Sequence, residues 1–311
     1  MRIALIYLIV AIICFVVVAF TYNFFTYWAL HLSSLKKERH PKFKTLKGAE
    51  PIFLENHGNR AVLLIHGFIG SPADFGRLPK LLYEKGFTVS APLLPGHGTD
   101  PRHFSKTTPK ELEDFVTSEY RKLKEQYKEV TLIGFSMGGA LSILTALKEK
   151  VDCLVLLAPY LRIAHQWYYI LPTEWHNKIF VNLIPYVYRP LCFKQINKKE
   201  SVPYIVDYDF VSLRGADTAI RLGNKALNNV AKLDQSVLII HGINDRATDY
   251  KLSKKLAEQL SQKTDSRFVS LPNTNHMMLW DYDSDLVEKE ILAFVRNAQN
   301  NTTQGGNYHA S

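Results

Sequence analysis

Hydrophobic and polar positions divide the chain into an apolar N-terminal run, a short basic stretch and a long region with a repeating pattern. Ile3 to Phe20 is an uncharged run of eighteen residues, IALIYLIVAIICFVVVAF. A run of this length predicts a membrane-spanning helix. From about residue 60, short apolar runs that predict strands alternate with longer stretches that predict helices.

The strands predicted in the repeating region are almost wholly apolar: AVLLIH, FTVSAP, EVTLIG, VDCLVLLAP, SVLIIHG and RFVSLP. Between them, one helix is expected from Ser71, as its N-cap, to Gly86. A capping box at Thr108 to Glu111 opens another, which reaches about Tyr127. Further helices are expected over GGALSILTALKE, from about Tyr250 to Gln262 and from about Asp283 to Ala298. Apolar strands that alternate with helices predict a mostly parallel sheet covered on both faces.

One long segment, from about Tyr160 to Asp234, interrupts this alternation and shows no obvious strand pattern. It is rich in bulky aromatic residues, and an excursion of this length favours a functional insertion with its own helices over a bare loop. We expect it to form a cap or lid over the strand ends. Trp167, Tyr168 and Trp175 are its candidates for contact with a substrate.

The N-terminal run is better explained as a retained anchor than as a cleaved signal peptide. It is longer than the apolar region of a usual signal, and no clear small-x-small cleavage site follows it. Aromatic residues that suit a membrane interface follow the run in TYNFFTYW. Six Lys or Arg and one Glu then lie between Lys36 and Lys47, whereas only Arg2 precedes the run. The positive-inside rule therefore predicts a cytoplasmic main domain.

Charge and cysteine content exclude some classes of protein. The formal charge is +9 over 311 residues, but it is concentrated near the N-terminus and in the long insertion, and no nucleic-acid-binding motif accompanies either cluster. A basic stretch beside a membrane segment fits anionic lipid head groups better. Three cysteines, Cys14, Cys153 and Cys192, argue against a disulfide framework.

The clearest chemical motif is GFSMGG, Gly134 to Gly139, between a predicted strand and a predicted helix. A G-x-S-x-G sequence in this position is typical of a nucleophilic serine on a tight turn, here Ser136. The alternative is a glycine-rich loop that merely begins a helix. The two are separated by the partners a serine nucleophile needs: a base, an acid that orients the base, and N–H donors for an oxyanion.

Suitable partners follow the serine in chain order. Asp245 lies in the loop after SVLIIHG, and His276 lies in the loop after RFVSLP. Both loops leave the carboxyl ends of predicted parallel strands, where such sheets place their sites. Asp249 is a rival acid, although it is better placed to begin or cap the next helix. The other histidines that could compete, His66, His97 and His241, are expected to lie in loops and to support backbone turns.

The oxyanion donors are expected to be backbone N–H groups. One is that of Met137, the residue after the nucleophile, and the other is that of Phe68 in the loop HGFIGSP. A simple turn at His66-Gly67 is compatible with this role.

At about residues 60 to 297 the chain resembles the α/β-hydrolase superfamily, and within it bacterial carboxylesterases and monoacylglycerol lipase-like enzymes. The resemblance rests on HGFIGSPADF, FTVSAPLLPGHGTDP, LIGFSMGG, LIIHGINDRATD and NTNHMM. It implies a triad of Ser136, Asp245 and His276, with no metal or cofactor. One departure is Arg246, because related enzymes often have small apolar residues after the acid. Arg246 is expected to pair with a neighbouring acid or to point outward.

These expectations divide the chain into an anchor at 1–30, a basic linker at 31–49, an α/β-hydrolase domain at 50–297 with its lid at about 160–234, and a flexible tail at 298–311. They predict a membrane-anchored serine hydrolase of carboxylic esters, with lipid-like substrates such as monoacylglycerols or lysophospholipids. Two alternatives stay open. An acyltransferase or thioesterase would use the same triad, and a non-catalytic membrane scaffold would keep only the fold.

Overall fold

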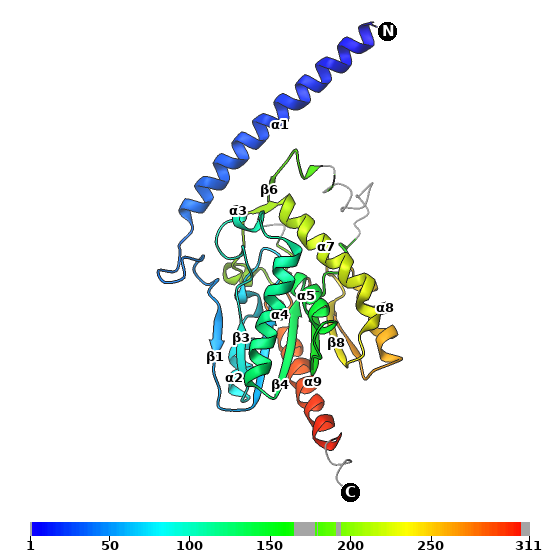
Figure 1. Ribbon diagram of the computed structural model, residues 1–311. Coiled ribbons are helices and arrows are strands. Elements are labelled where there is room, and N and C mark those ends of the chain that lie inside the picture. The colour runs from blue at the N-terminus through cyan, green and yellow to red at the C-terminus, as the bar shows by residue number, and fades with distance from the viewer. Residues whose placement is uncertain (1, 165–177, 179, 191–193, 306–311) are drawn as a thin grey trace.

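The structure is a computed structural model that describes residues 2–164, 178, 180–190 and 194–305. Its centre is a seven-stranded sheet in the order β1-β3-β2-β4-β5-β8-β9 (Figure 1). Every neighbouring pair is parallel except β1 with β3. The strands are β1 (Ile52–Leu54), β2 (Arg60–Ile65), β3 (Thr88–Ala91), β4 (Glu129–Phe135), β5 (Cys153–Leu157), β8 (Val237–Gly242) and β9 (Arg267–Leu271). The predicted mostly parallel sheet is confirmed, whereas β1 was not predicted, because three residues are too few to show a pattern.

Helices cover both faces of the sheet, and the strands supply side chains to each face alternately. On one face, Leu132 of β4 and Leu154 of β5 join a core with α4 (Pro109–Gln126), α5 (Met137–Ala146) and α8 (Tyr250–Ser261). On the other, Ile133 and Val155 join a core with α2 (Leu78–Glu84) and α9 (Ser284–Gly305). Burial on both faces is the reason these strands are apolar throughout.

Most predicted helices are present, with two differences. The single helix expected between Ser71 and Gly86 is broken in two, because η1 (Pro72–Phe75) ends at Gly76, whose φ of 52° is incompatible with a continuous right-handed helix. The last helix, α9, continues to Gly305 and therefore enters the segment expected to be a flexible tail. The capping box at Thr108 is confirmed.

The segment between β5 and β8 contains more than helices. It includes η3 (Lys199–Tyr204), α7 (Leu213–Asn229) and η4 (Val230–Lys232), as expected of an insertion with its own helices. It also forms an antiparallel two-stranded sheet from β6 (Tyr186–Tyr188) and β7 (Phe210–Ser212), which the sequence did not predict. Strands of three residues are stabilised by their pairing and packing rather than by a local pattern. Trp167, Tyr168 and Trp175, the expected substrate contacts, lie outside the described residues.

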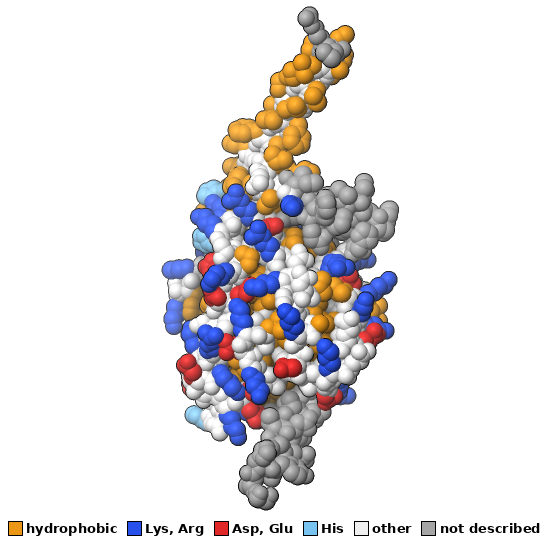
Figure 2. All heavy atoms as spheres, turned by 45° about the vertical axis from the view of Figure 1, so that its right-hand side comes forward, with side chains coloured by type: hydrophobic (Ala, Val, Ile, Leu, Met, Phe, Trp, Pro, Cys, Tyr) orange, Lys and Arg blue, Asp and Glu red, His pale blue; other side chains and the backbone are white. Residues whose placement is uncertain are grey.

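The N-terminal helix α1 (Arg2–Lys36) projects from the domain (Figure 1). It is the one helix in the described part of the chain that is long and apolar enough to cross a membrane. Figure 2 shows its hydrophobic side chains standing clear of the domain, with Lys and Arg side chains near the junction. The helix ends at Lys36 rather than near residue 30, so six residues expected in the linker are helical. The short helix α3 (Pro101–Phe104) lies in the loop after β3.

Candidate active site

Ser136 occupies a strained turn between β4 and α5. Its φ is 53° and its ψ is −118°, a conformation that L-residues rarely adopt. The neighbouring glycines make this turn sterically possible. A Cβ on Gly134 would lie 2.4 Å from the carbonyl oxygen of Gly138, and a Cβ on Gly138 would lie 2.0 Å from that of Ile65. The glycines around the serine are therefore required by close backbone contacts, and the turn places Ser136 at the carboxyl end of β4.

His276 joins this serine to Asp245. The distance from Ser136 Oγ to His276 Nε2 is 2.9 Å, and that from His276 Nδ1 to Asp245 Oδ2 is 2.7 Å. With a proton on Nδ1, the imidazole donates to the carboxylate and accepts from the serine hydroxyl. The structure thus brings together all three residues predicted as a triad, which come from three different loops.

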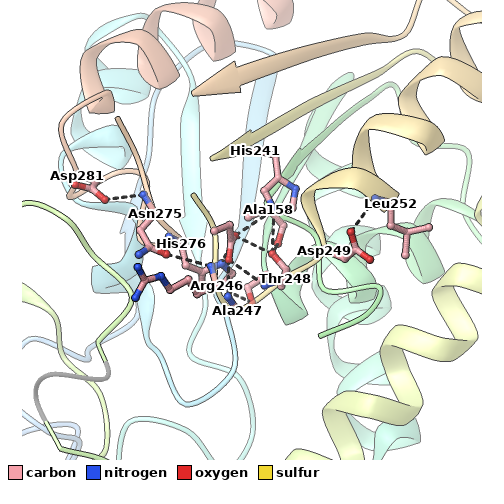
Figure 3. Close-up of polar contacts among 12 residues, drawn as sticks. Ala158, His241, Arg246, Ala247, Thr248, Asp249, Leu252, Asn275, His276 and Asp281 are labelled. Atoms are coloured by element: carbon pink, nitrogen blue, oxygen red, sulfur yellow. Dashed lines mark hydrogen bonds and ion pairs between the residues drawn. The ribbon is translucent and has the colours of Figure 1, made fainter. Parts of the chain in front are cut away.

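Asp245 is held by five donors. Its Oδ1 accepts from the backbone N–H groups of Ala247 and Thr248, at 2.7 and 2.9 Å. Its Oδ2 accepts from Thr248 Oγ1 at 2.8 Å and lies 3.1 Å from His241 Nε2, in addition to His276 (Figure 3). Burial opposes ionisation of this carboxyl, but the neighbouring histidines and these hydrogen bonds hold its pKa well below its usual range. Asp245 is therefore a carboxylate at neutral pH.

His241 has a different place from the one expected. It lies in β8 rather than in a loop, it is fully buried, and its Nε2 faces the acid. Its Nδ1 is buried without a partner in the described part of the chain, so Nε2 is the nitrogen that carries the hydrogen-bonding role. The sequence offers one signal for this contact: an i, i+4 spacing across the turn that ends β8.

The rival acid and the departure at Arg246 are both resolved. Asp249 caps α8, because its Oδ1 accepts from the N–H of Leu252 at 3.0 Å, as predicted. Arg246 is exposed, which agrees with an outward side chain, and its backbone N–H donates to Asn275 Oδ1 at 3.3 Å. The residue after the acid thus ties the acid loop to the histidine loop (Figure 3).

The histidine loop is also tied to the inserted segment. Gln195 accepts from the N–H groups of His276 and Met277 through its backbone carbonyl. The fully buried Asp281 accepts from the N–H of Asn275 at 2.8 Å and from those of Asn197 and Lys198 at 3.0 and 2.9 Å. The position of His276 therefore depends on contacts with residues about eighty positions away, which no local pattern reveals.

The loop after β2 lies against the serine. A Cβ on Gly67 would lie 3.2 Å from the Cβ of Ser136, so the backbone approaches the nucleophile closely. The N–H groups of Phe68 and Met137, the predicted oxyanion donors, make no hydrogen bond to any acceptor in the described residues. His66 supports this loop as expected, because its Nε2 accepts from the N–H of Leu94 and its Nδ1 bonds the carbonyl of Gly67.

Asp74 is a further buried carboxyl beside the site. Its Oδ2 accepts from the N–H of Gly67 at 3.1 Å, which fixes the loop that carries Phe68. Burial raises its pKa to about 7, and the nearby Asp207 contributes in the same direction. The sequence motif GSPAD contained this residue, but nothing in it distinguished a buried acid from a helix-capping one.

A cavity of about 560 Å³ opens beside Ser136 and His276. Apolar side chains line most of it, and they come from the loop after β2, from the segment after β5, from β6 and β7, and from α7: Phe68, Ile163, Val187, Val211, Leu213 and Ile220. This size suits a small organic ligand. Within the described residues, no cluster of three or more His, Cys, Asp or Glu side chains is placed to bind a metal ion.

A serine–histidine–aspartate arrangement at the strand ends of this sheet defines a serine hydrolase of the α/β-hydrolase superfamily. Residues 56–283 match the family described as Serine aminopeptidase, S33, and the chain belongs to that family. It is similar to a carboxylesterase of Bacillus subtilis (strain 168), with 22% identity over 82% of this chain and 96% of the relative. It is also 37% identical to a thermostable monoacylglycerol lipase of Bacillus sp. (strain H-257), over 34% of this chain and 42% of the relative.

Solved structures share the fold. A monoacylglycerol lipase of Paleococcus ferrophilus superposes with a TM-score of 0.67 at 20% identity, covering 80% of this chain and 98% of that structure. A structure from a study of the metagenome-derived lipolytic enzymes LipS and LipT gives a TM-score of 0.68 at 23% identity, covering 81% and 99%. Together with the family match and the carboxylesterase and lipase relatives, the shared fold makes the chain an enzyme of the esterase/lipase-type hydrolases.

Proposed function

We propose that the protein cleaves carboxylic esters through an acyl-enzyme formed on Ser136. The observation that carries the proposal is the hydrogen-bonded sequence from Ser136 Oγ through His276 to the ionised Asp245, beside an apolar cavity. His276 removes the serine proton as Oγ attacks the acyl carbon, and Asp245 orients the imidazole and stabilises its charged form. The N–H groups of Phe68 and Met137 donate to the oxyanion.

The attack of Ser136 forms a tetrahedral intermediate, and its collapse breaks the ester C–O bond. His276 Nε2 gives its proton to the departing alcohol, and the acyl group stays on Ser136. Water then attacks the acyl carbon while His276 takes one of its protons, and the second collapse returns the proton to Ser136 and releases the acid. His241 acts as a positioning residue, because it contacts Asp245 and does not line the cavity. Thr248 also holds Asp245 in place, although it lies at the cavity wall.

The proposed substrates are single-chain lipid esters such as monoacylglycerols or lysophospholipids. The mostly apolar wall of the cavity supports an acyl chain, and the monoacylglycerol lipases among the relatives support the same class. The segment at about 160–234 is proposed as the lid, because β6, β7 and α7 all contribute to this wall.

Membrane attachment through α1, with the domain on the cytoplasmic side, completes the proposal. A cleaved signal would not be expected to pack on the mature domain, yet Leu30 of α1 is 1% exposed against Tyr186 and Phe210. Carbonate-washed membranes should retain the full-length protein with its N-terminus intact, and protease added outside sealed inside-out vesicles should digest the domain. Recovery as a soluble, N-terminally shortened protein would contradict the anchor.

Ser136→Ala tests the chemistry. Hydrolysis of p-nitrophenyl butyrate should fall by about 10³-fold or more, as is usual when a nucleophile of this kind is removed. Labelling by a fluorophosphonate should be lost as well. Ser142→Ala is the matched control, since Ser142 is also buried, in α5, but does not line the cavity. Unchanged hydrolysis in Ser136→Ala would contradict the proposal.

A further inference from the structure

The last part of α1 is packed on the inserted segment rather than being a free tether. Ser33 Oγ donates to Asp209 Oδ2 at 2.7 Å, and Lys37 Nζ lies 3.0 Å from Asp209 Oδ1. The rings of Tyr27 and Tyr186 make an edge contact at 5.3 Å between centroids. Asn23 Nδ2 donates to the carbonyl of Leu183 at 2.8 Å. These contacts fix α1 against β6 and β7.

The length of α1 places these contacts at the membrane surface. The helix has 35 residues, and about 20 residues are enough to cross the hydrocarbon of a bilayer. If the uncharged run from Ile3 spans the membrane, the helix from about Tyr22 onward emerges from it, and that is the part that contacts the inserted segment. The sheet β6–β7 therefore lies next to the lipid head groups.

A groove of about 790 Å³ runs between α1 and this small sheet. Phe25, Trp28, Ala29 and Leu32 of α1 line one side, and Tyr188 and Phe210 line the other, with Lys36 and Lys37 at one end. Its walls are predominantly apolar, and the helix that forms it continues directly into the apolar run. Such a groove suits a hydrocarbon chain better than a polar ligand.

Tyr188 lies between this groove and the active-site cavity. It lines both, and its ring packs on Phe210 with centroids 5.3 Å apart. Its neighbour Val187 also lines the cavity, so β6 is a wall one strand thick between the two spaces. Tyr188 is 56% exposed, which leaves room for a change of rotamer.

We propose that the groove between α1 and β6–β7 is the entry site through which one acyl chain of a lipid monoester passes from the bilayer to Ser136. Tyr188 separates the groove from the cavity and turns aside as the chain enters. The inference rests on the proposed ester hydrolysis and on membrane attachment through α1. It adds a binding site for the acyl chain and explains why the anchor is packed on the domain.

The first test fills the groove. Full-length Leu32→Trp and wild type are reconstituted in phosphatidylcholine vesicles that contain 1-monooleoylglycerol, and p-nitrophenyl acetate is the water-soluble control substrate. Leu32→Trp should lower kcat/KM for the vesicle-borne ester by about tenfold or more and change acetate hydrolysis less than twofold. His31→Trp is the matched control. His31 is adjacent to Leu32 and is exposed, but it does not line the groove, so this variant should change neither rate.

The outcomes separate this inference from the proposed function. Absence of acetate hydrolysis in the wild type would contradict the esterase itself. The entry site would be overturned if Leu32→Trp hydrolysed monooleoylglycerol as fast as the wild type. It would also be overturned if His31→Trp lost as much of this activity as Leu32→Trp.

A second measurement does not depend on a groove-filling variant. Ser136→Ala in the same vesicles is photolysed with a monoacylglycerol that carries a diazirine in its acyl chain. Peptides containing Tyr188 or Phe210 should be labelled, and excess monooleoylglycerol should compete with the label whereas excess phosphatidylcholine should not. Labelling confined to the membrane span, or unaffected by monooleoylglycerol, would overturn the proposal.

Discussion

The two sides of the cavity are built in different ways. Ser136, Asp245 and His276 lie just after the carboxyl ends of the parallel strands β4, β8 and β9, and the sheet sets the spacing of these three ends. The opposite side is formed by β6, β7 and α7, which are positioned by contacts with α1 and with the loop of His276. In the proposed function, the first side carries the chemistry and the second controls which substrate reaches it. Disruption of the two sides should therefore affect catalysis and access separately.

The largest effect is expected at the acid. Asp245→Asn should lower kcat for p-nitrophenyl butyrate by about 10³- to 10⁴-fold, because the amide no longer stabilises a charged His276 or selects its tautomer. KM should change little. Asp249→Asn is the control, since asparagine also caps helices and the carboxyl of Asp249 bonds only within α8 in the described residues. Similar losses in both variants would mean that the acid has been misassigned.

The next effect belongs to the other side of the cavity. Leu30→Ala should weaken docking of α1 on β6–β7 by about 2–3 kcal/mol, as is usual for a buried leucine. Limited proteolysis should then cut faster within residues 180–210, while hydrolysis of p-nitrophenyl acetate stays close to the wild-type rate. Leu35→Ala removes an exposed leucine of the same helix and should leave proteolysis unchanged. If Leu30→Ala also lost most of its acetate hydrolysis, the two sides of the cavity would not be separable.

A smaller effect on kcat is expected at His241, the buried histidine that contacts Asp245. His241→Leu removes a donor to Asp245 Oδ2 and should lower kcat by about tenfold, the equivalent of about 1.4 kcal/mol. His241→Gln keeps an N–H donor and should recover part of this rate. A purely structural role would instead lower the melting temperature of both variants while leaving kcat of the folded protein unchanged.

The last effect concerns the pH dependence of stability and depends on Asp74, which lies outside the triad. Its pKa of about 7 in the folded protein exceeds the ordinary value near 4, so ionisation costs stability as pH rises from about 4 to 7 and the cost is constant above that. Asp74→Asn removes this contribution, which has a slope of at most about 1.4 kcal/mol per pH unit. The melting temperature of the variant relative to wild type should therefore be higher at pH 8 than at pH 4. The exposed Asp234→Asn should show no such difference.

Local sequence patterns were sufficient to predict six of the seven strands of the large sheet and the three loops that carry Ser136, Asp245 and His276. The apolar strands are buried on both faces, and Gly134 and Gly138 are needed for backbone contacts at the turn of Ser136, so each leaves a mark within a few residues. The strands β1, β6 and β7 left no such mark, because three-residue strands depend on partners elsewhere. The break at Gly76 was missed because a helical pattern does not reveal a positive φ.

By itself, the sequence determined the class of fold, the order of serine, acid and histidine, and a helix suited to a membrane, because these depend on residue type and short spacing. Only the tertiary structure showed that His241 contacts Asp245 and that Asp74 is buried against the loop of Phe68. It also showed that α1 packs on β6–β7. These facts depend on contacts between residues far apart in the chain, and only folding brings such residues together.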